Sequence, residues 1–188
     1  MSMTVKRRRD DRTPRYLQHR VADIRGGVSI AASELGGDYL PEGAVLSLPD
    51  EKGICHVVKI GEVAAEVAAA DKTIKVKKLH NFKVGDFITA KPGGKAEAIT
   101  AIDESNKTYD ILTVGAALGA ITLGECVVEA KEKSDASELK YEPKALNGTG
   151  KPVDPKSNLD TDAWLFAVTK GLKLPGFIAE KLKGIINY

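Results

Sequence analysis

The feature that most constrains this chain is the alternation of apolar and polar residues between Ile74 and Ala130. Branched or aromatic residues recur there at nearly every second position, and Gly, Asp, Asn and Pro interrupt them every several residues. A period of two places successive side chains on opposite faces of a strand, and the interrupting residues favour turns. The stretch therefore predicts short antiparallel strands joined by tight turns, as in a small β-barrel or sandwich.

One hairpin is especially clear within this stretch. Ile99 and Ile102 precede the polar run 103–107, and Tyr109 and Ile111 follow it. Asn and Asp in the run tolerate turn conformations, whereas the branched and aromatic residues suit a half-buried strand. Composition agrees with a turn-rich β protein, because the 188 residues include 18 Gly and 8 Pro but only 5% aromatic residues.

Positive charge is concentrated at the N-terminus. Residues 1–25 carry eight Lys and Arg against three Asp, a formal charge of +5, whereas the whole chain carries +2. We predict an extended basic arm over 1–25, disordered on its own, that docks into an acidic groove on a partner protein; a solvated tail and a nucleic-acid contact are the alternatives. The residues assigned to docking are Arg7, Arg8, Arg9, Arg12, Arg15, Tyr16 and Leu17.

The rest of the chain divides into three predicted segments. Residues 26–130 form the β body, in which 61–70 has either helical propensity or the pattern of a strand ending in a loop. Residues 131–158 contain few large apolar side chains and predict an exposed polar linker. Residues 159–188 predict a strand and a short C-terminal helix that form the interface of a homo-oligomer, a trimer being favoured. The predicted interface residues are Trp164, Phe166, Phe177, Ile178, Leu182 and Ile185.

No pattern typical of a catalytic centre, a metal site or a cofactor site occurs. His19, His56 and His80 are not at metal-ligand spacing from one another or from cysteine. Cys55 and Cys126 lie far apart in apolar runs, which predicts buried free thiols and manufacture in a reducing cytoplasm. No apolar run approaches the ~18 residues needed to span a bilayer. We therefore expect neither an enzyme nor a membrane protein.

Six segments of turn-and-strand pattern point to a known family: 40–46, 80–88, 98–103, 109–114, 118–125 and 174–178. Together they resemble the head fibre and head decoration proteins of tailed bacteriophages, especially phages of Bacteroides-type gut bacteria. The resemblance implies a β-rich, often oligomeric virion protein without catalytic residues. It also implies attachment to the major capsid protein on the capsid exterior, after assembly in the host cytoplasm. The arm lies outside the resembling segments, so its docking role is a separate inference.

The competing interpretation is a nucleic-acid-binding β-barrel that uses the basic arm. A cluster of lysines would then follow the phosphates: Lys72, Lys75, Lys77, Lys78 and Lys83. Lys75 and Lys77 alternate with Ile74 and Val76. This alternation is also typical of an edge strand whose charged outer face prevents aggregation with other strands. Surface aromatic residues for base stacking are missing from the pattern. We therefore favour the capsid protein, with nucleic acid as the alternative partner.

Overall fold

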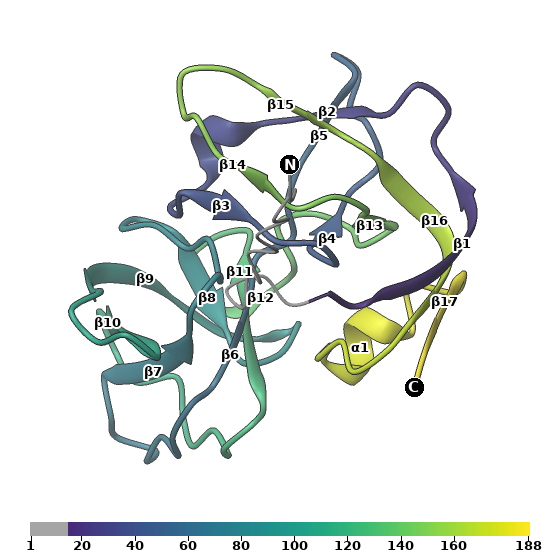
Figure 1. Cartoon of the computed structure of the whole chain (residues 1–188). Coiled ribbons are helices and arrows are strands. Elements are labelled where there is room, and N and C mark those ends of the chain that lie inside the picture. The colour runs from purple at the N-terminus through teal and green to yellow at the C-terminus, as the bar shows by residue number, and fades with distance from the viewer. Residues whose placement is uncertain (1–14) are drawn as a thin grey trace, which may run out of the picture.

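The computed structural model describes residues 15–188, and its architecture is mainly β (Figure 1). This confirms the predicted class. A 3-10 turn, η1 (Ala32–Glu34), and a one-turn helix, α1 (Gly176–Ala179), accompany the strands. The strands are β1 (Leu17–Asp23), β2 (Val28–Ile30), β3 (Tyr39–Leu40), β4 (Val45–Leu46), β5 (Ile54–Cys55), β6 (Ile60–Glu62), β7 (Thr73–Lys77), β8 (Phe87–Thr89), β9 (Gly94–Asp103), β10 (Tyr109–Val114), β11 (Cys126–Ala130), β12 (Ser134–Ser137), β13 (Ala145–Asn147), β14 (Lys151–Pro152), β15 (Leu159–Thr161), β16 (Ala163–Thr169) and β17 (Ile185–Asn187).

The central stretch forms a seven-stranded sheet with the order β6-β11-β8-β9-β10-β7, and β12 pairs with β9. The predicted hairpin is present as β9 and β10, which pair Leu112 with Ile102. On β7 the alternation places Ile74 and Val76 in the core and the lysines outside. The two ends of the sheet meet at one bridge between Val63 and Val76, so the sheet curls around its core without forming a closed barrel. Residues 61–62 belong to β6, and 63–70 continue as bends and a turn with single bridges at Val63 and Val67, so this segment is a strand ending in a loop and the helical alternative is wrong.

A five-stranded sheet forms the second half of the molecule, with the order β1-β16-β13-β4 and β17 paired to β16. Its strands alternate between two cores. Ala145 and Leu46 lie opposite each other and pack on the strands β2 and β5, whereas Leu146 and Val45 pack on the side of α1. The sheet is therefore buried on both faces near β13, which explains the continuous burial of that short strand.

Two smaller sheets cover the first of these cores. They are the three-stranded sheet β15-β2-β5 and the two-stranded sheet β14-β3. Ile30 and Leu40 from these sheets are fully buried in the same cluster as Leu46. The body is thus two packed groups of sheets, with the seven-stranded sheet in one group and the remaining sheets in the other (Figure 1).

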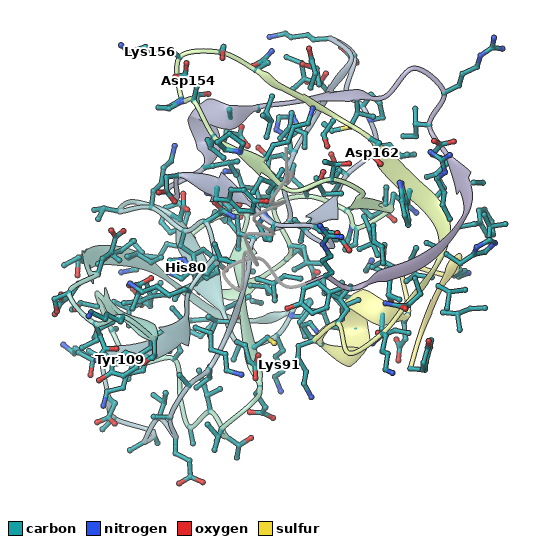
Figure 2. All side chains as sticks on the ribbon, in the orientation of Figure 1. His80, Lys91, Tyr109, Asp154, Lys156 and Asp162 are labelled. Carbon is teal, nitrogen blue, oxygen red and sulfur yellow. The ribbon has the colours of Figure 1, made fainter. Side chains whose placement is uncertain are left out.

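The predicted polar linker is wrong for residues 131–158, because they contain β12, β13 and β14. Asn147 shows why a polar composition was misleading. Its side chain is fully buried, and its polar groups have partners inside the protein. The amide donates to the carbonyl oxygens of Pro41 and Thr149, and Oδ1 accepts from the Thr161 hydroxyl. A buried amide with these partners is compatible with a core position. Asp154 and Lys156 lie on the outlying loop between β14 and β15 (Figure 2).

The predicted C-terminal helix is much shorter than the apolar spacing indicated. Its backbone is helical only at 176–179, and the chain then turns and adds β17 parallel to β16. Gly184 allows this return, because a Cβ atom there would lie 2.2 Å from the carbonyl oxygen of Leu165. Pairing with the sheet therefore takes precedence over local helical periodicity in this segment.

The boundary between arm and body also differs from the prediction. Tyr16 and Leu17 belong to the body, because their backbone N–H groups donate to Glu42 Oε1 at 2.9 and 2.7 Å, and Leu17 begins β1. Strand β1 pairs with β16 from Leu17 to Asp23 through three irregularities in register. Among the other predicted docking residues, Arg15 is exposed just before β1, and Arg7, Arg8, Arg9 and Arg12 lie outside the described residues.

This boundary gives the first prediction. Deletion of residues 1–25 removes β1 and exposes the hydrogen-bonding edge of β16, whereas deletion of residues 2–14 leaves that ladder complete. We expect the longer deletion to lower the melting temperature by several degrees relative to the shorter one, as measured by circular dichroism. Equal melting temperatures for the two truncated proteins would contradict a contribution of β1 to the fold.

Candidate functional site

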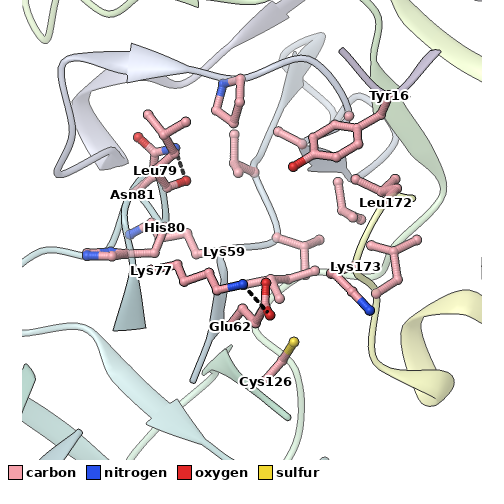
Figure 3. Close-up of a pocket in the computed structure, with 18 of the residues that line it drawn as sticks. Tyr16, Lys59, Glu62, Lys77, Leu79, His80, Asn81, Cys126, Leu172 and Lys173 are labelled. Atoms are coloured by element: carbon pink, nitrogen blue, oxygen red, sulfur yellow. Dashed lines mark hydrogen bonds and ion pairs between the residues drawn. The ribbon is translucent and has the colours of Figure 1, made fainter. Parts of the chain in front are cut away.

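Two neighbouring hollows lie between the seven-stranded sheet and the rest of the molecule. The first hollow has a volume of about 250 Å³ and is walled by 41–45, 57–60, 77–81 and 172–174 (Figure 3). The second hollow has a volume of about 330 Å³ and is lined by 36–39 and by the chain around His80. Both hollows share the segment 78–81, which makes this segment the centre of the candidate site.

The shared segment has an unusual backbone. Leu79 and Asn81 have φ angles of +70° and +58°. The left-handed conformation costs a residue such as leucine about 1–2 kcal/mol, whereas asparagine tolerates it. Gly36 holds the segment by donating its N–H to the carbonyl oxygen of Asn81, and a Cβ atom on Gly36 would lie 2.0 Å from the carbonyl oxygen of Phe82. Strain of this kind is a reason to examine a segment for function.

The imidazole of His80 uses both of its nitrogens within the protein. The backbone N–H of Phe82 donates to Nδ1 at 2.9 Å, so the proton lies on Nε2, which donates to Asp110 Oδ2 at 3.1 Å. Burial lowers the pKa of His80 more than the neighbouring Asp110 raises it. The neutral ring therefore lacks a vacant nitrogen to act as a general base, and its role is to hold the segment in place. Lys78 donates to the other oxygen of Asp110.

Beside the first hollow lies a buried network of charges. The ammonium group of Lys59, which is 1% exposed, lies 2.5 Å from Asp86 Oδ2 and 3.3 Å from Glu129 Oε1. Lys140 approaches the same oxygen of Glu129 at 2.8 Å. Burial raises the pKa of Glu129, and the positive charge of Lys59 opposes that shift. Lys59 lies just before β6, whereas Asp86 lies in the loop before β8 and Glu129 lies on β11. The network therefore holds the segment between β5 and β6 against the seven-stranded sheet.

The second prediction concerns this network. The change Lys59→Met would leave two buried carboxylates without their common partner, and we expect it to lower the free energy of unfolding by about 3–5 kcal/mol. Urea denaturation measures this loss. Lys144→Met is the matched control, because Lys144 pairs with the exposed Glu142 and should change stability little. A loss no larger than that of the control would show that the buried network contributes little.

A third polar cluster joins three distant parts of the chain. The Tyr141 hydroxyl lies 2.9 Å from both carboxylate oxygens of Glu34, and His56 Nδ1 lies 3.1 Å from Oε2. The rings of His56 and Tyr141 stack with centroids 4.2 Å apart. Burial raises the pKa of Glu34, but hydrogen bonds from the two rings outweigh it, so the pKa is lowered on balance. The cluster therefore favours an ionised Glu34.

A pH dependence follows from the lowered pKa of Glu34. A group whose pKa is lower in the folded state contributes stability above its ordinary value of 4.5 and loses it as the pH falls through the folded value. At neutral pH we expect Glu34→Gln to lower the free energy of unfolding by about 1–2 kcal/mol. The difference from the wild type should shrink below pH 4.5 in denaturant titrations. The exposed Glu51→Gln serves as the control, and a difference that stays constant with pH would be inconsistent with this role.

Both cysteines are buried free thiols, as the sequence predicted. Burial raises the pKa of Cys55 and of Cys126 to about 11, so at neutral pH both are protonated and weakly nucleophilic.

Within residues 15–188 there is no group of three or more His, Cys, Asp or Glu that could hold a metal ion. No helix in this part of the chain is long and apolar enough to cross a membrane.

Several predicted oligomer-interface residues lie in the protein's own core. Ile178 and Leu182 are 0% and 2% exposed, so a partner subunit cannot reach them in this fold. Phe177 and Ile185 are half-buried against the same core. Trp164 is also half-buried, and its indole N–H donates to Asp162. Burial therefore removes Ile178 and Leu182 from the predicted interface, whereas Phe177, Ile185 and Trp164 keep part of their surface exposed.

Phe166 is the exception among these residues, because it is 55% exposed. It belongs to an apolar patch on three adjacent strands, which we define by Val21 on β1, Phe166 on β16, and Ile186 and Tyr188 at β17 and the residue after it. Ile186 and Tyr188 were not among the predicted interface residues. The short-range pattern could not identify them, because their exposure depends on β17 joining the edge of the sheet.

The lysine cluster considered for nucleic acid is largely engaged within the protein. Lys77 donates to Glu62, Lys78 to Asp110 and the carbonyl oxygen of Glu104, and Lys83 to the carbonyl oxygen of Ser33. The ammonium of Lys75 lies 5.4 Å from the centre of the Tyr109 ring. These partners compete with phosphate groups, so the surface at β7 gives little support to the nucleic-acid alternative.

Comparison with models of protein families, with curated proteins and with solved structures finds no match to this chain. The resemblance to phage head proteins thus rests on the six sequence segments.

The pair Gly36 and Gly37 is the sequence signal that could have located the second hollow. Paired glycines mark places where the backbone approaches another segment closely, and here that segment is 81–83.

Proposed function

We propose that this protein is a virion structural protein, a head fibre or decoration protein bound to the major capsid protein on the outside of a tailed-phage head. The proposal is supported by the sequence resemblance and the mainly β body. The main observation in its support is the exposed apolar patch. The patch lies on the same sheet as β1, the strand that follows the first part of the basic arm. Exposed apolar side chains on adjacent elements mark surfaces for protein association.

The arm acts as the anchor to the shell in this proposal. Arginine pairs with carboxylates through two parallel hydrogen bonds, and a repeating shell can present carboxylates in rows. Ordering the arm costs about 1–2 kcal/mol of backbone entropy per residue, so charge pairs alone are marginal. Apolar contacts next to the arm therefore have to contribute. Assembly onto the capsid takes place in the host cytoplasm.

The apolar patch acts as the contact between subunits of a homo-oligomer, with a trimer favoured. Large side chains such as Phe166 and Tyr188 contribute disproportionately to association, because they bury much area at little cost in conformational entropy. The sandwich-like body then holds the patch on the same sheet as β1, the strand that follows residues 1–14. This arrangement would let several arms of one oligomer bind the shell together and strengthen its attachment.

The anchor is tested by deleting residues 2–14, which keeps β1 intact. Purified capsids that lack the protein are mixed with the wild type or the deletion variant and sedimented. We expect the variant to remain in the supernatant while its melting temperature and oligomeric state stay unchanged. If the variant occupies capsids as fully as the wild type, the arm is a tail and the proposed anchor is wrong.

The subunit contact is tested by Phe166→Ser. Loss of a central aromatic contact should weaken association by roughly 2 kcal/mol or more per contact, which light scattering after size exclusion detects as dissociation on dilution. Leu123→Ser is the matched control, because Leu123 is 62% exposed on the other group of sheets. A wild-type monomer, or an oligomer equally sensitive to both changes, would disprove the assigned interface.

A further inference from the structure

Three buried ionisable side chains meet beside the first hollow. Lys59, Asp86 and Glu129 are 1%, 6% and 1% exposed, so bulk water has little access to any of them. Lys59 Nζ lies 2.5 Å from Asp86 Oδ2 and 3.3 Å from Glu129 Oε1. A buried amine in contact with a buried carboxyl can condense with it to an amide, and a second carboxyl beside the pair can carry the protons.

Backbone hydrogen bonds hold the three residues in position. The N–H of Glu129 donates to the carbonyl oxygen of Lys59 at 3.0 Å, which places these two residues on neighbouring segments. The N–H of Ile99 donates to the carbonyl oxygen of Asp86 at 2.8 Å, and the N–H of Lys83 donates to Asp86 Oδ2 at 2.9 Å. Because Cγ of Asp86 is bonded to Oδ2, it lies within about 3.8 Å of Nζ, near the separation of about 3–3.5 Å at which reacting atoms are well placed.

Burial also favours the loss of the two charges. An ammonium group and a carboxylate removed from water carry a desolvation cost that can exceed their mutual attraction. Conversion of Lys59 and Asp86 to a neutral amide removes both charges, and the limited access of water hinders hydrolysis of the product. The pair of Lys144 and Glu142 lies at 2.8 Å but is exposed, so water solvates both of its charges and the same driving force is absent.

Glu129 has the properties of a proton carrier. Lys140 donates to its Oε1 at 2.8 Å and holds the carboxyl group in place. The other oxygen, Oε2, is buried and has no hydrogen-bond partner among residues 15–188. Burial raises the pKa of this carboxyl, and the charges of Lys59 and Lys140 oppose the shift only in part. Glu129 therefore accepts a proton more readily than an exposed carboxylate does, as an acid–base residue must.

We propose that Lys59 and Asp86 form an intramolecular amide bond once the chain has folded, with Glu129 as the acid–base residue. One proton passes from Nζ to the Asp86 carboxyl group along their 2.5 Å contact, and the neutral amine attacks Cγ. Glu129 takes a second proton from the attacking nitrogen and delivers it to the hydroxyl group of the tetrahedral intermediate, which leaves as water. The ammonium and the carboxylate thus become one amide and one water molecule, and the carboxylate of Glu129 is regenerated.

The bond joins the segment between β5 and β6 to the seven-stranded sheet. The ion pair assembles the site, and the amide then makes the connection covalent without an oxidant or a cofactor. Cys55 and Cys126 are free thiols, so a disulfide does not supply this connection. The reaction takes place within one folded chain and does not depend on a capsid, so its test and the capsid test can fail separately.

Mass spectrometry of the denatured full chain tests the bond directly. We expect the wild-type mass to be lower than the mass of its sequence by one water molecule. A tryptic digest should contain a branched peptide that joins Lys59 to Asp86. Lys59→Arg keeps the positive charge but lacks the amine, so this variant should have its full sequence mass. Lys144→Arg is the matched control at the exposed ion pair, and it should carry the bond as the wild type does.

Glu129→Gln tests the proton carrier. The amide side chain has nearly the same shape and can still accept a hydrogen bond from Lys140, but it does not take up a proton from Nζ. Cell-free synthesis sampled over time allows the rate of water loss to be compared between the two proteins. We expect this variant to form the bond slower than the wild type by roughly a hundredfold or more.

The proposal is overturned if the wild type retains its full sequence mass while a cooperative melt in circular dichroism shows that it is folded. It is also overturned if the branched peptide joins a different pair, such as Lys140 and Glu129. Bond formation by Glu129→Gln at the wild-type rate would disprove the role of Glu129. The wild-type mass requires no substitution, so it decides the question even if Lys59→Arg fails to fold.

Discussion

The arrangement of the molecule depends on the buried ion pairs of Lys59. An ammonium group removed from water is costly unless carboxylates surround it, and Asp86 and Glu129 do so from the seven-stranded sheet and its loops. Lys59 itself lies on the chain that enters this sheet from the strands of the other group. The pairing therefore determines where the two groups of sheets meet. Both hollows lie at the boundary between the two groups of sheets, and Lys59 lines the first hollow.

The segment between the hollows shows how packing imposes an unusual backbone. Leu79 would not adopt a left-handed conformation by itself, but His80 is bonded at both nitrogens and Gly36 holds Asn81 from the opposite wall. These contacts over-determine the segment, and they bury Asn81 Oδ1 against Gly37 without a donor from residues 15–188.

The surfaces proposed for association lie elsewhere, on β1, β16 and β17. Strand β1 is an edge strand with three irregularities in its register, which hinder the addition of another strand to that edge. Association through side chains such as Phe166 is therefore favoured over extension of the sheet. Charge from the arm and apolar area from the patch are complementary, since the former gives attraction at long range and the latter gives contact energy.

The sequence by itself determined the strands whose partners are close along the chain. The alternation at Ile99–Ile111 and the turn between these residues specify the hairpin locally, and the apolar runs around the cysteines indicate buried thiols. Only the tertiary structure decided that Asn147 is buried, because its partners include Pro41, 106 residues away. It also decided that Ile178 belongs to the core and Ile186 to the surface. The burial of Ile178 follows from the packing of α1 against Val45 and Leu146, and the exposure of Ile186 follows from the pairing of β17 with β16. Local periodicity carries no information about such contacts between distant segments.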